Sequence, residues 1–277
     1  MYKVLEVEHL NPTVTRLKVE APEVARKALP GQFVIVRTDE AGERIPLTIS
    51  NYDRGLGHIE IIFQIVGSET FLLDRKKPGD YLSDIAGPLG IASETQGKNK
   101  VAVVGGGVGC AIALPVARQF AQDGAVVHSI VGFRTRDLVI LEDEFKDFSA
   151  EFRMMTDDGS YGQKGLVTNA LEELICAGHQ YDEVFAVGPV IMMKFVAQLT
   201  KQYKVKTKVS MNPIMVDGTG MCGACRVQVG SETKFACVHG PDFDGHLIDY
   251  DLLMRRNTQY RDKEQANVQE VGMVCNA

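Results

Sequence analysis

The sequence predicts three parts in order: a small antiparallel β-barrel over residues 1–97, a doubly wound α/β domain over 98–206, and a small module with a C-terminal helix over 207–277. Three observations predict this fold. Short alternating runs divided by Pro and Gly turns fill the first part, as in antiparallel sheets. Buried-type strands then alternate with helical stretches. Beyond residue 206, glycines and three closely spaced cysteines replace both patterns.

Composition narrows the class of protein. The chain has 277 residues, 45% of them hydrophobic and 24% charged, as in globular proteins. Its net charge is −6 without a long basic block, so we expect no nucleic-acid partner. The N-terminus lacks the pattern of a secretory signal, and the most apolar stretch, 101–117, is too short and glycine-rich for a membrane helix. We therefore expect a cytoplasmic protein without a membrane span.

The first part reads as strands on both sides of short turns. Its alternating runs are KVLEVEHL, TRLKVEA, QFVIVRT, PLTISNY, HIEIIFQIVG and DYLSDIAG. Polar and apolar residues alternate within them, which gives each strand one buried and one exposed face. The polar segment 94–100 then ends the pattern, and it places a domain boundary near residue 98.

The second part alternates strands with helices. Such alternation predicts a parallel sheet with helices on both faces. The predicted strands are 101–107, 125–133, 151–158 and 182–189, and the predicted helices are 110–123, 137–148 and 166–178. The tail 251–265 is amphipathic and predicts one more helix.

A glycine-rich turn follows the first of these strands. Gly106, Gly107, Val108 and Gly109 connect it to a helix, and glycines there let backbone N–H groups approach a pyrophosphate at the helix N-terminus. The spacing differs from GxGxxG, so a plain tight turn is an alternative. Asp157 and the pair 188–189 also follow predicted strands, at the sheet edge where open α/β folds bind ligands.

The barrel carries a second candidate site. Arg44, Pro46, Leu47 and Thr48 lie in a strand-like segment, and a polar turn opens the next helical stretch. The turn consists of Gly67, Ser68, Glu69 and Thr70. An arginine and hydroxyl groups could flank a phosphorylated cofactor whose pyrophosphate faces the helix N-terminus. The alternative is a surface arginine and an ordinary Ser/Thr helix cap.

The cysteines of the third part suggest a metal centre. Cys222, Cys225 and Cys237 supply three thiolates, whereas a [2Fe–2S] cluster or a structural zinc needs four ligands. Asp217 stands four residues before Cys222, where the first cysteine of a plant-type C-x₄-C-x₂-C run would stand. His239 would instead complete a Cys₃His zinc site. An unliganded Asp-Gly turn is the third alternative. No local Ser/His/Asp or Cys/His arrangement occurs, and we predict no catalytic side chain.

The order of these motifs resembles a known family over essentially the whole chain. Arg-x-Pro-Leu-Thr, the GGGVG turn and Asp-x₄-Cys-x₂-Cys-x₁₁-Cys are similar in order to the ferredoxin-reductase superfamily, in the branch of dihydroorotate dehydrogenase electron-transfer subunits. Within that branch, Asp217 in place of a cysteine resembles the small subunits of NADH-dependent reduced ferredoxin:NADP⁺ oxidoreductase. One departure is Ile45, which separates Arg44 from Pro46.

The resemblance implies three cofactors and the residues that hold them. It implies FAD at Arg44, Pro46, Leu47, Thr48, Ile62, Phe63, Gln64, Gly67, Ser68, Glu69 and Thr70. It implies NAD(H) at Gly106, Gly107, Val108, Gly109, Arg134, Asp157, Gly188 and Pro189. It implies a [2Fe–2S] cluster at Asp217, Cys222, Cys225 and Cys237.

A nicotinamide donates two electrons together, whereas an iron–sulfur cluster accepts one at a time. A flavin between them is therefore required to separate the electron pair. The resemblance further implies an electron-bifurcating complex with a larger flavin and iron–sulfur subunit, which carries the NADP(H) site and meets ferredoxin. Two alternatives are an electron-transfer subunit of dihydroorotate dehydrogenase and a zinc-stabilised, non-catalytic cofactor-sensing module.

Overall fold

The computed structural model describes residues 1–260, 262–264 and 266. Its first part is a nearly closed antiparallel sheet of seven strands in the order β6-β1-β2-β5-β4-β3-β7. The strands are β1 (Tyr2–Asn11), β2 (Val14–Glu20), β3 (Phe33–Arg37), β4 (Ile45–Asp53), β5 (His58–Gln64), β6 (Tyr81–Leu82) and β7 (Asp84–Leu89). Two short helices, α1 (Pro22–Lys27) and α2 (Ser68–Asp74), accompany them.

The barrel forms because alternate side chains of its strands are apolar. In β2 and β5, Leu17 pairs with Ile61 and Val19 pairs with Ile59, and all four are fully buried. Lys18 and Glu60, which lie between them on the two strands, are polar and only partly buried, as expected for a half-buried antiparallel sheet.

The second sheet is parallel except at one edge. Its order is β11-β10-β9-β8-β12-β13-β16, with β8 (Lys100–Gly106), β9 (Val126–Phe133), β10 (Glu151–Thr156), β11 (Gln163–Lys164) and β12 (Glu183–Val187). Strands β8 and β12 are buried almost throughout because helices cover both faces. The chain leaves β8 toward β9 and later returns on the other side as β12. The order in which strands are added thus changes side at β8, and doubly wound sheets bind ligands in the crevice at such a point, at the carboxyl ends of the strands.

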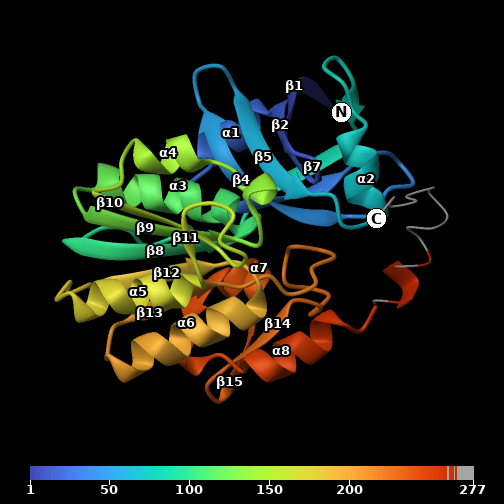
Figure 1. Cartoon of the computed structure of the whole chain (residues 1–277). Helices are drawn as coiled ribbons and strands as arrows, with labels where there is room; N and C mark the ends of the chain where they lie inside the picture. Colours follow the sequence, from blue (N-terminus) through green and yellow to red (C-terminus); the bar gives the residue numbers. More distant parts are fainter. Residues whose placement is uncertain (261, 265, 267–277) are drawn as a thin grey trace.

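The helices divide between the two faces of this sheet (Figure 1). On the barrel side, α3 (Gly109–Gln122) and α4 (Glu142–Lys146) share a core with Val14 and Ile62 of the barrel. On the opposite side, α5 (Val167–Cys176) and α6 (Val190–Gln202) pack against the sheet and the C-terminal segments. The barrel therefore lies against one helical layer, near the carboxyl ends of β8 and β9.

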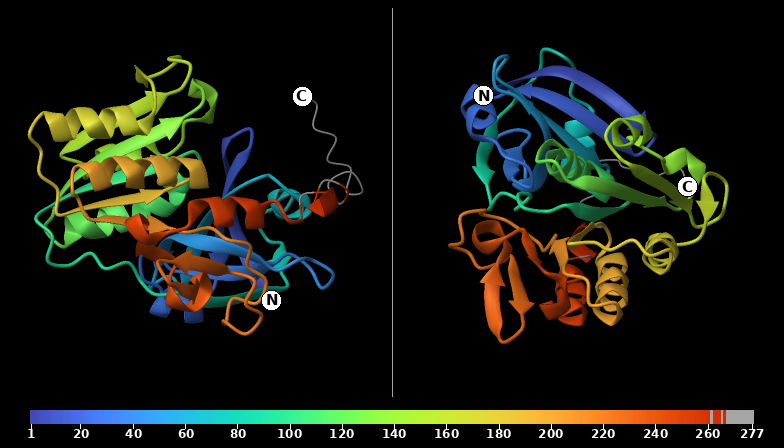
Figure 2. Two further views of the ribbon diagram at one scale, coloured as in Figure 1. Left: turned by 90° about the horizontal axis from the view of Figure 1, so that it is seen from below. Right: turned by 90° about the vertical axis from the view of Figure 1, so that its left-hand side faces the viewer.

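The C-terminal part joins both sheets. It contains β13 (Thr207–Ser210), β14 (Arg226–Val229), β15 (Glu232–Phe235), α7 (Ala236–His239), β16 (Asp242–Asp244), a one-turn 3₁₀ helix (Gly245–Leu247) and α8 (Tyr250–Asn257). A second one-turn 3₁₀ helix, Arg136–Leu138, precedes α4 in the α/β part. The predicted boundary at 206–207 falls just before β13, which pairs with β12, so this part supplies two strands of the second sheet. Figure 2 shows its orange and red segments beside the barrel, and Phe33 and Ile35 of the barrel share its core.

Two predicted helices differ from the observed ones. The helix predicted over 137–148 is a 3₁₀ turn followed by the short α4, because Leu141 adopts a left-handed conformation (φ 62°) between them. The apolar run that suggested a helix instead crosses the core in extended form, with Ile140 and Leu141 buried. The tail helix predicted over 251–265 is observed as α8, and residues 261 and 265 lie outside the described residues.

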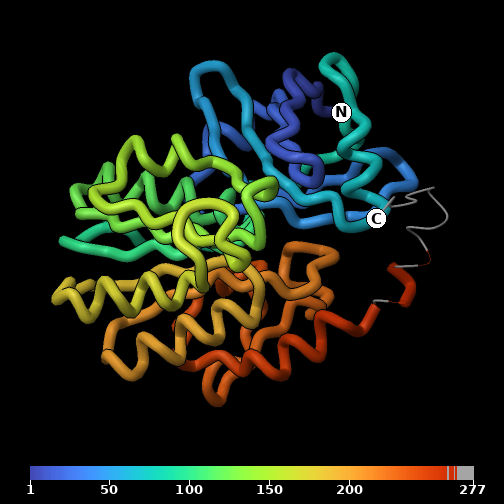
Figure 3. The backbone as a smooth tube through the Cα atoms, in the orientation of Figure 1, coloured from blue at the N-terminus to red at the C-terminus, as the bar shows by residue number. Residues whose placement is uncertain are grey.

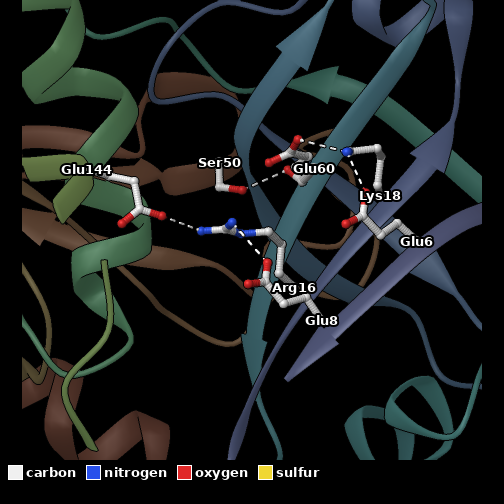
Figure 4. A network of polar contacts seen from close by, with 7 residues as sticks. All are labelled: Glu6, Glu8, Arg16, Lys18, Ser50, Glu60 and Glu144. Atoms are coloured by element: carbon white, nitrogen blue, oxygen red, sulfur yellow. Dashed lines mark hydrogen bonds and ion pairs between the residues drawn. The ribbon is translucent and has the colours of Figure 1, made fainter. Parts of the chain in front are cut away.

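Polar contacts fix the barrel against α4. Figure 4 shows Arg16 of β2 between two carboxylates, with 3.0 Å to Glu8 of β1 and 2.8 Å to Glu144 of α4. Asn11 adds a second link, because its side-chain amide donates to the carbonyl of Leu138 at 3.1 Å. These contacts hold the two sheets together beside the cavity described next.

Candidate functional site

The glycine-rich turn shapes one wall of a cavity. Gly107 has φ +55°, a left-handed conformation that suits glycine, and its N–H donates to the carbonyl of Gly132 at 2.9 Å. At Gly109, a Cβ atom would stand 2.6 Å from the carbonyl oxygen of Val187 and 2.7 Å from Cα of Gly188. The first turn of α3 therefore lies directly against the end of β12, which only glycine permits.

The cavity lies at the carboxyl ends of the parallel strands. Its volume is about 650 Å³, within the usual range for sites that bind small molecules and cofactors. All eight nucleotide candidates line it: Gly106, Gly107, Val108, Gly109, Arg134, Asp157, Gly188 and Pro189. Among the described residues no side chain caps the N-terminus of α3, so its positive dipole end is directed to this space.

The barrel and the C-terminal part complete the cavity, with one flavin candidate and three residues that the sequence did not single out. Asn11, Thr13 and Gln64 line it from the barrel, and Asn212 lines it from the C-terminal part. Gln64 is the one flavin candidate among them. Asn11 and Thr13 lie at the turn between β1 and β2, and Asn212 lies far along the sequence, after β13. They carry no local spacing signal, so the fold brings the turn and Asn212 together.

The flavin candidates lie on neighbouring strands. Pro46, Leu47 and Thr48 are in β4, each partly exposed, and they pair with Ile35, Val34 and Phe33 of β3. Ile62, Phe63 and Gln64 end the adjacent strand β5. The side chains of Ile62 and Phe63 are buried in hydrophobic cores, so these two residues could contact a ligand only through their backbone.

The turn before α2 satisfies much of its own hydrogen bonding. The Thr70 hydroxyl accepts from the N–H groups of Val66 and Gly67 and donates to the carbonyl of Gly67 at 2.9 Å. Thr70 thus caps its helix, which was the alternative open at the level of sequence. Glu69 is buried, and its carboxylate accepts from the N–H groups of Thr38 and Glu43. Ser68 and Gly67 stay partly accessible.

Arg44 is directed away from this turn. Its Nε donates to the carbonyl of Val216 at 3.3 Å, and its Nη1 lies 3.5 Å from the carboxylate of Asp84. The guanidinium thus reaches the loop that precedes the cysteines. Ile45 separates Arg44 from Pro46, which is the departure noted in the sequence.

Two of the three clustered cysteines form a buried pair. The Sγ atoms of Cys225 and Cys237 are 3.2 Å apart, and both residues are only 2% exposed. Cys222 is exposed on the preceding loop, where Gly218, Gly220 and Gly223 all have positive φ. Within the described part of the chain, no three Asp, Glu, His or Cys side chains already form a metal-binding group.

The two candidates for the fourth ligand make local hydrogen bonds. Asp217 accepts from the N–H of Thr219 at 2.9 Å and from its hydroxyl, the pattern of an Asp-Gly turn. His239 Nδ1 accepts from the N–H of Phe235 at 3.0 Å, and the two rings stack. A zinc site through His239 would therefore have to use its other ring nitrogen.

Comparison with known proteins explains this loop. The family model of the iron-sulfur cluster binding domain of dihydroorotate dehydrogenase B matches residues 212–249. The matched segment holds all four cluster candidates, Asp217, Cys222, Cys225 and Cys237.

Relatives extend the match to most of the chain. The dihydroorotate dehydrogenase B (NAD(+)) electron transfer subunit of Desulforamulus reducens is 33% identical over 87% of this chain and 94% of that protein. A Thermotoga maritima homolog of such subunits is 46% identical over 89% of this chain and 87% of its own length. The chain belongs to the dihydroorotate dehydrogenase B electron-transfer subunit family. Its named relatives are subunits of oxidoreductases, so the predicted enzyme class is confirmed.

A solved structure matches this family member still more completely. One chain of the NADH-dependent reduced ferredoxin-NADP oxidoreductase, in a structure that concerns flavin-based electron bifurcation, has a TM-score of 0.92 and 41% identity. The alignment covers 98% of this chain and 97% of that one. The fold class and the family resemblance predicted from the motifs are both confirmed.

The chemistry of the buried cysteine pair suits a metal cluster. Burial, with the neighbouring Cys225 as a further cause, raises the pKa of the Cys237 thiol to about 12. Such thiols ionise only when a cation compensates the charge, and the iron of a cluster would supply it. Gly218, Gly220 and Gly223 also have positive φ values, a conformation in which the loop backbone can approach a bound cluster closely. The residues present therefore fit an iron–sulfur cluster.

Across the described ranges, 1–260, 262–264 and 266, every helix is too short or too polar to cross a bilayer.

A buried carboxyl links the first and third parts of this electron-transfer subunit homologue and should make its stability depend on pH. Asp242 of β16 accepts from Ser93, in the segment after β7, at 2.5 Å, and its other oxygen has no partner among the described residues. Desolvation raises its pKa from the ordinary value to about 6, although hydrogen bonds from Ser93 and Ser210 and the charge of Lys208 oppose this, whereas the Glu183 charge adds to it.

Because the folded state holds this proton more tightly, stability should fall as pH rises from about 4 to about 6 and stay reduced above that. We expect Asp242→Asn to remove this component, on the order of 1–3 kcal/mol between pH 4 and 7. Urea unfolding at a series of pH values measures it. The exposed Asp244→Asn on the same strand is the control and should keep the wild-type pH profile. A wild-type slope in Asp242→Asn would refute the assignment.

Proposed function

We propose that this chain passes electrons between NAD(H), FAD and a [2Fe–2S] cluster as the small subunit of an electron-bifurcating NADH-dependent ferredoxin:NADP⁺ oxidoreductase. The observation that carries the proposal is the match to a chain of that oxidoreductase over 98% of this sequence at 41% identity. The cavity and the cysteine pair give the proposal its chemistry.

The nicotinamide nucleotide is assigned to the 650 Å³ cavity. The turn 106–109 and the N-terminus of α3 would receive the pyrophosphate through backbone N–H groups. Arg134, Asp157 and the pair 188–189 would orient the rest of the nucleotide. Gln64 would meet the end that reaches the barrel, where β5 ends beside the same space.

The flavin is assigned to the barrel surface along β4 and the end of β5. Pro46, Leu47 and Thr48 would hold it by backbone and hydroxyl contacts, and Gly67 and Ser68 would face its phosphates. When bound, FAD supplies the conversion between two-electron and one-electron transfer that the other two groups require. The side chains of this chain bind and orient the cofactors, and none is needed as an acid or base.

The cluster is assigned to Cys222, Cys225, Cys237 and Asp217. The buried pair would hold one side of it, and the glycine-rich loop would bring the other two ligands. The proposed partner is a larger flavin and iron–sulfur subunit that carries the NADP(H) site, and ferredoxin would be reached through that subunit. The proposed compartment is the cytoplasm, because clustered cysteines stay reduced there.

An electron-transfer subunit of dihydroorotate dehydrogenase is the second candidate, because the family model and the Desulforamulus relative carry that name. Metal, flavin and visible-spectrum analysis of the protein purified with its natural partner separates the candidates. We expect iron, FAD and an oxidoreductase subunit with a second flavin. Co-purification with a dihydroorotate-oxidising subunit supports the second candidate, and a colourless zinc protein refutes both.

We expect the nucleotide site to prefer NADH to NADPH. The carboxylate of Asp157 lines the cavity and would repel the 2′-phosphate of NADPH. Arg136 could attract that phosphate, but its guanidinium lies over the ring of Tyr161, 5.5 Å from the ring centroid. Repulsion between this carboxylate and the 2′-phosphate should make flavin reduction by NADPH about tenfold slower, or slower still, than reduction by NADH. Stopped-flow reduction with both nucleotides at equal concentration measures it, and Asp157→Asn should narrow the difference. Faster reduction by NADPH would overturn the preference.

A further inference from the structure

The loop that carries Asp217 rests on the flavin barrel. Figure 3 shows the orange segment after β13 running along the barrel. At Gly218, where φ is +83°, a Cβ atom would stand 2.8 Å from Ile35 of β3 and 2.9 Å from Leu89 of β7. The backbone beside Asp217 therefore touches two barrel strands, and a side chain at 218 would push it away.

Arg44 reaches this loop from the barrel. It stands directly before β4, and its Nε donates to the carbonyl of Val216 at 3.3 Å. Its Nη1 lies 3.5 Å from Asp84, the first residue of β7. One guanidinium thus joins the edge of the barrel to the residue that precedes Asp217.

The segment that carries Arg44 is itself anchored. The buried carboxylate of Glu69 accepts from the N–H of Thr38 at 2.7 Å and from the N–H of Glu43 at 3.1 Å. Both donors belong to the connection between β3 and β4. Since Glu69 lies in the first turn of α2, this connection is tied to the helix beside the proposed flavin site. The backbone next to Arg44 is therefore anchored to the barrel part.

The charge of Arg44 acts on the same loop. Its guanidinium donates to the carbonyl of Val216, the residue before Asp217, so a permanently charged group lies at the loop that would hold the cluster. A fixed positive charge near a cluster favours its reduced form, because reduction adds negative charge.

We propose that Arg44 is a positioning residue for the cluster loop: it holds the Asp217 segment against the barrel, and its charge raises the reduction potential of the cluster. The proposal rests on the proposed function in so far as it concerns the cluster. It replaces the expected role of Arg44 as a flavin ligand, and it couples the flavin barrel to the cluster through one side chain.

The test compares Arg44→Gln and Arg44→Lys with a matched control, Arg54→Gln, in the full chain. Arg54 also donates to a barrel carbonyl, that of Ala28 at 2.9 Å, at the other end of β4. We expect Arg44→Gln to lower the cluster midpoint potential in an EPR-monitored titration and to leave the flavin content unchanged. Arg44→Lys keeps the charge and should restore most of the potential. A shift of equal size in Arg54→Gln overturns the proposal.

Hydrogen exchange tests the contact without any cofactor. In protein freed of metal and flavin, Arg44→Gln should speed amide exchange over 216–221 about fivefold, the effect of losing one hydrogen bond. Unchanged exchange together with an unchanged potential refutes the proposal, and loss of flavin without either change makes Arg44 a flavin ligand instead. A wild-type protein without an EPR signal on reduction refutes the proposed function, while the exchange experiment still decides the contact.

A second variant covers the case in which Arg44→Gln does not fold. Asp84→Asn removes the ion-pair partner and leaves the charge of Arg44 less compensated, so the midpoint potential should rise. A potential equal to that of the wild type in Asp84→Asn contradicts the proposal.

Discussion

Gly109→Val is expected to eliminate most NADH-dependent flavin reduction. The new side chain would meet backbone atoms of Val187 and Gly188 at less than 3 Å, and backbone cannot move aside as a flexible side chain can. Either α3 or the turn after β12 must shift, and both line the nucleotide cavity. Overpacking of this kind costs about 1–3 kcal/mol or more, which corresponds to a loss of about tenfold to a hundredfold in nucleotide affinity.

The measurement is the NADH concentration dependence of flavin reduction, with thermal unfolding and flavin content as checks on folding. Gly55→Val is the matched control, because that glycine lies in the β4–β5 turn and a Cβ there meets only Asp53 at 3.4 Å. Full NADH-dependent reduction in Gly109→Val would mean that the turn has a structural role only.

The sequence predicted those parts of the molecule whose signal is local. The apolar run of β8, the glycines after it and the alternation in the barrel each depend on neighbours within a few residues, and each was placed correctly. The eight nucleotide candidates line one cavity, because the carboxyl ends of parallel strands meet at one edge. Their role in nucleotide binding stays a prediction.

Features that depend on contacts between residues far apart in the sequence could not be predicted from local patterns. Leu141 ends an expected helix because its side chain is used in the core, not on a helix face. Arg44 contacts a loop that is 172 residues away in the sequence, and its predicted flavin contact stays a prediction. The carboxylate of Glu69 accepts hydrogen bonds from two backbone N–H groups of the β3–β4 connection. None of these partners could be inferred from spacing.

The largest effect on the metal centre is expected from Asp217. If its carboxylate ligates iron, Asp217→Ala should lose most of the iron or hold it labilely, since three thiolates leave one position unfilled. Asp217→Cys should keep a [2Fe–2S] cluster with a shifted potential and altered visible and EPR spectra, because thiolate is a softer donor of the same charge. Iron content and EPR spectra after reduction measure both.

Asp217→Asn separates ligation from the turn that the structure shows. Asparagine forms the same turn with Thr219 but lacks the negative charge of a ligand, so a role in the turn alone predicts wild-type iron content for this variant. Ligation predicts a loss close to that of Asp217→Ala. Asp158→Ala is the control, because Asp158 binds the N–H and hydroxyl of Ser160 in the same pattern and lies on another loop. If Asp217→Cys gives an unchanged EPR spectrum, Asp217 is not a ligand, even in a protein that contains the cluster.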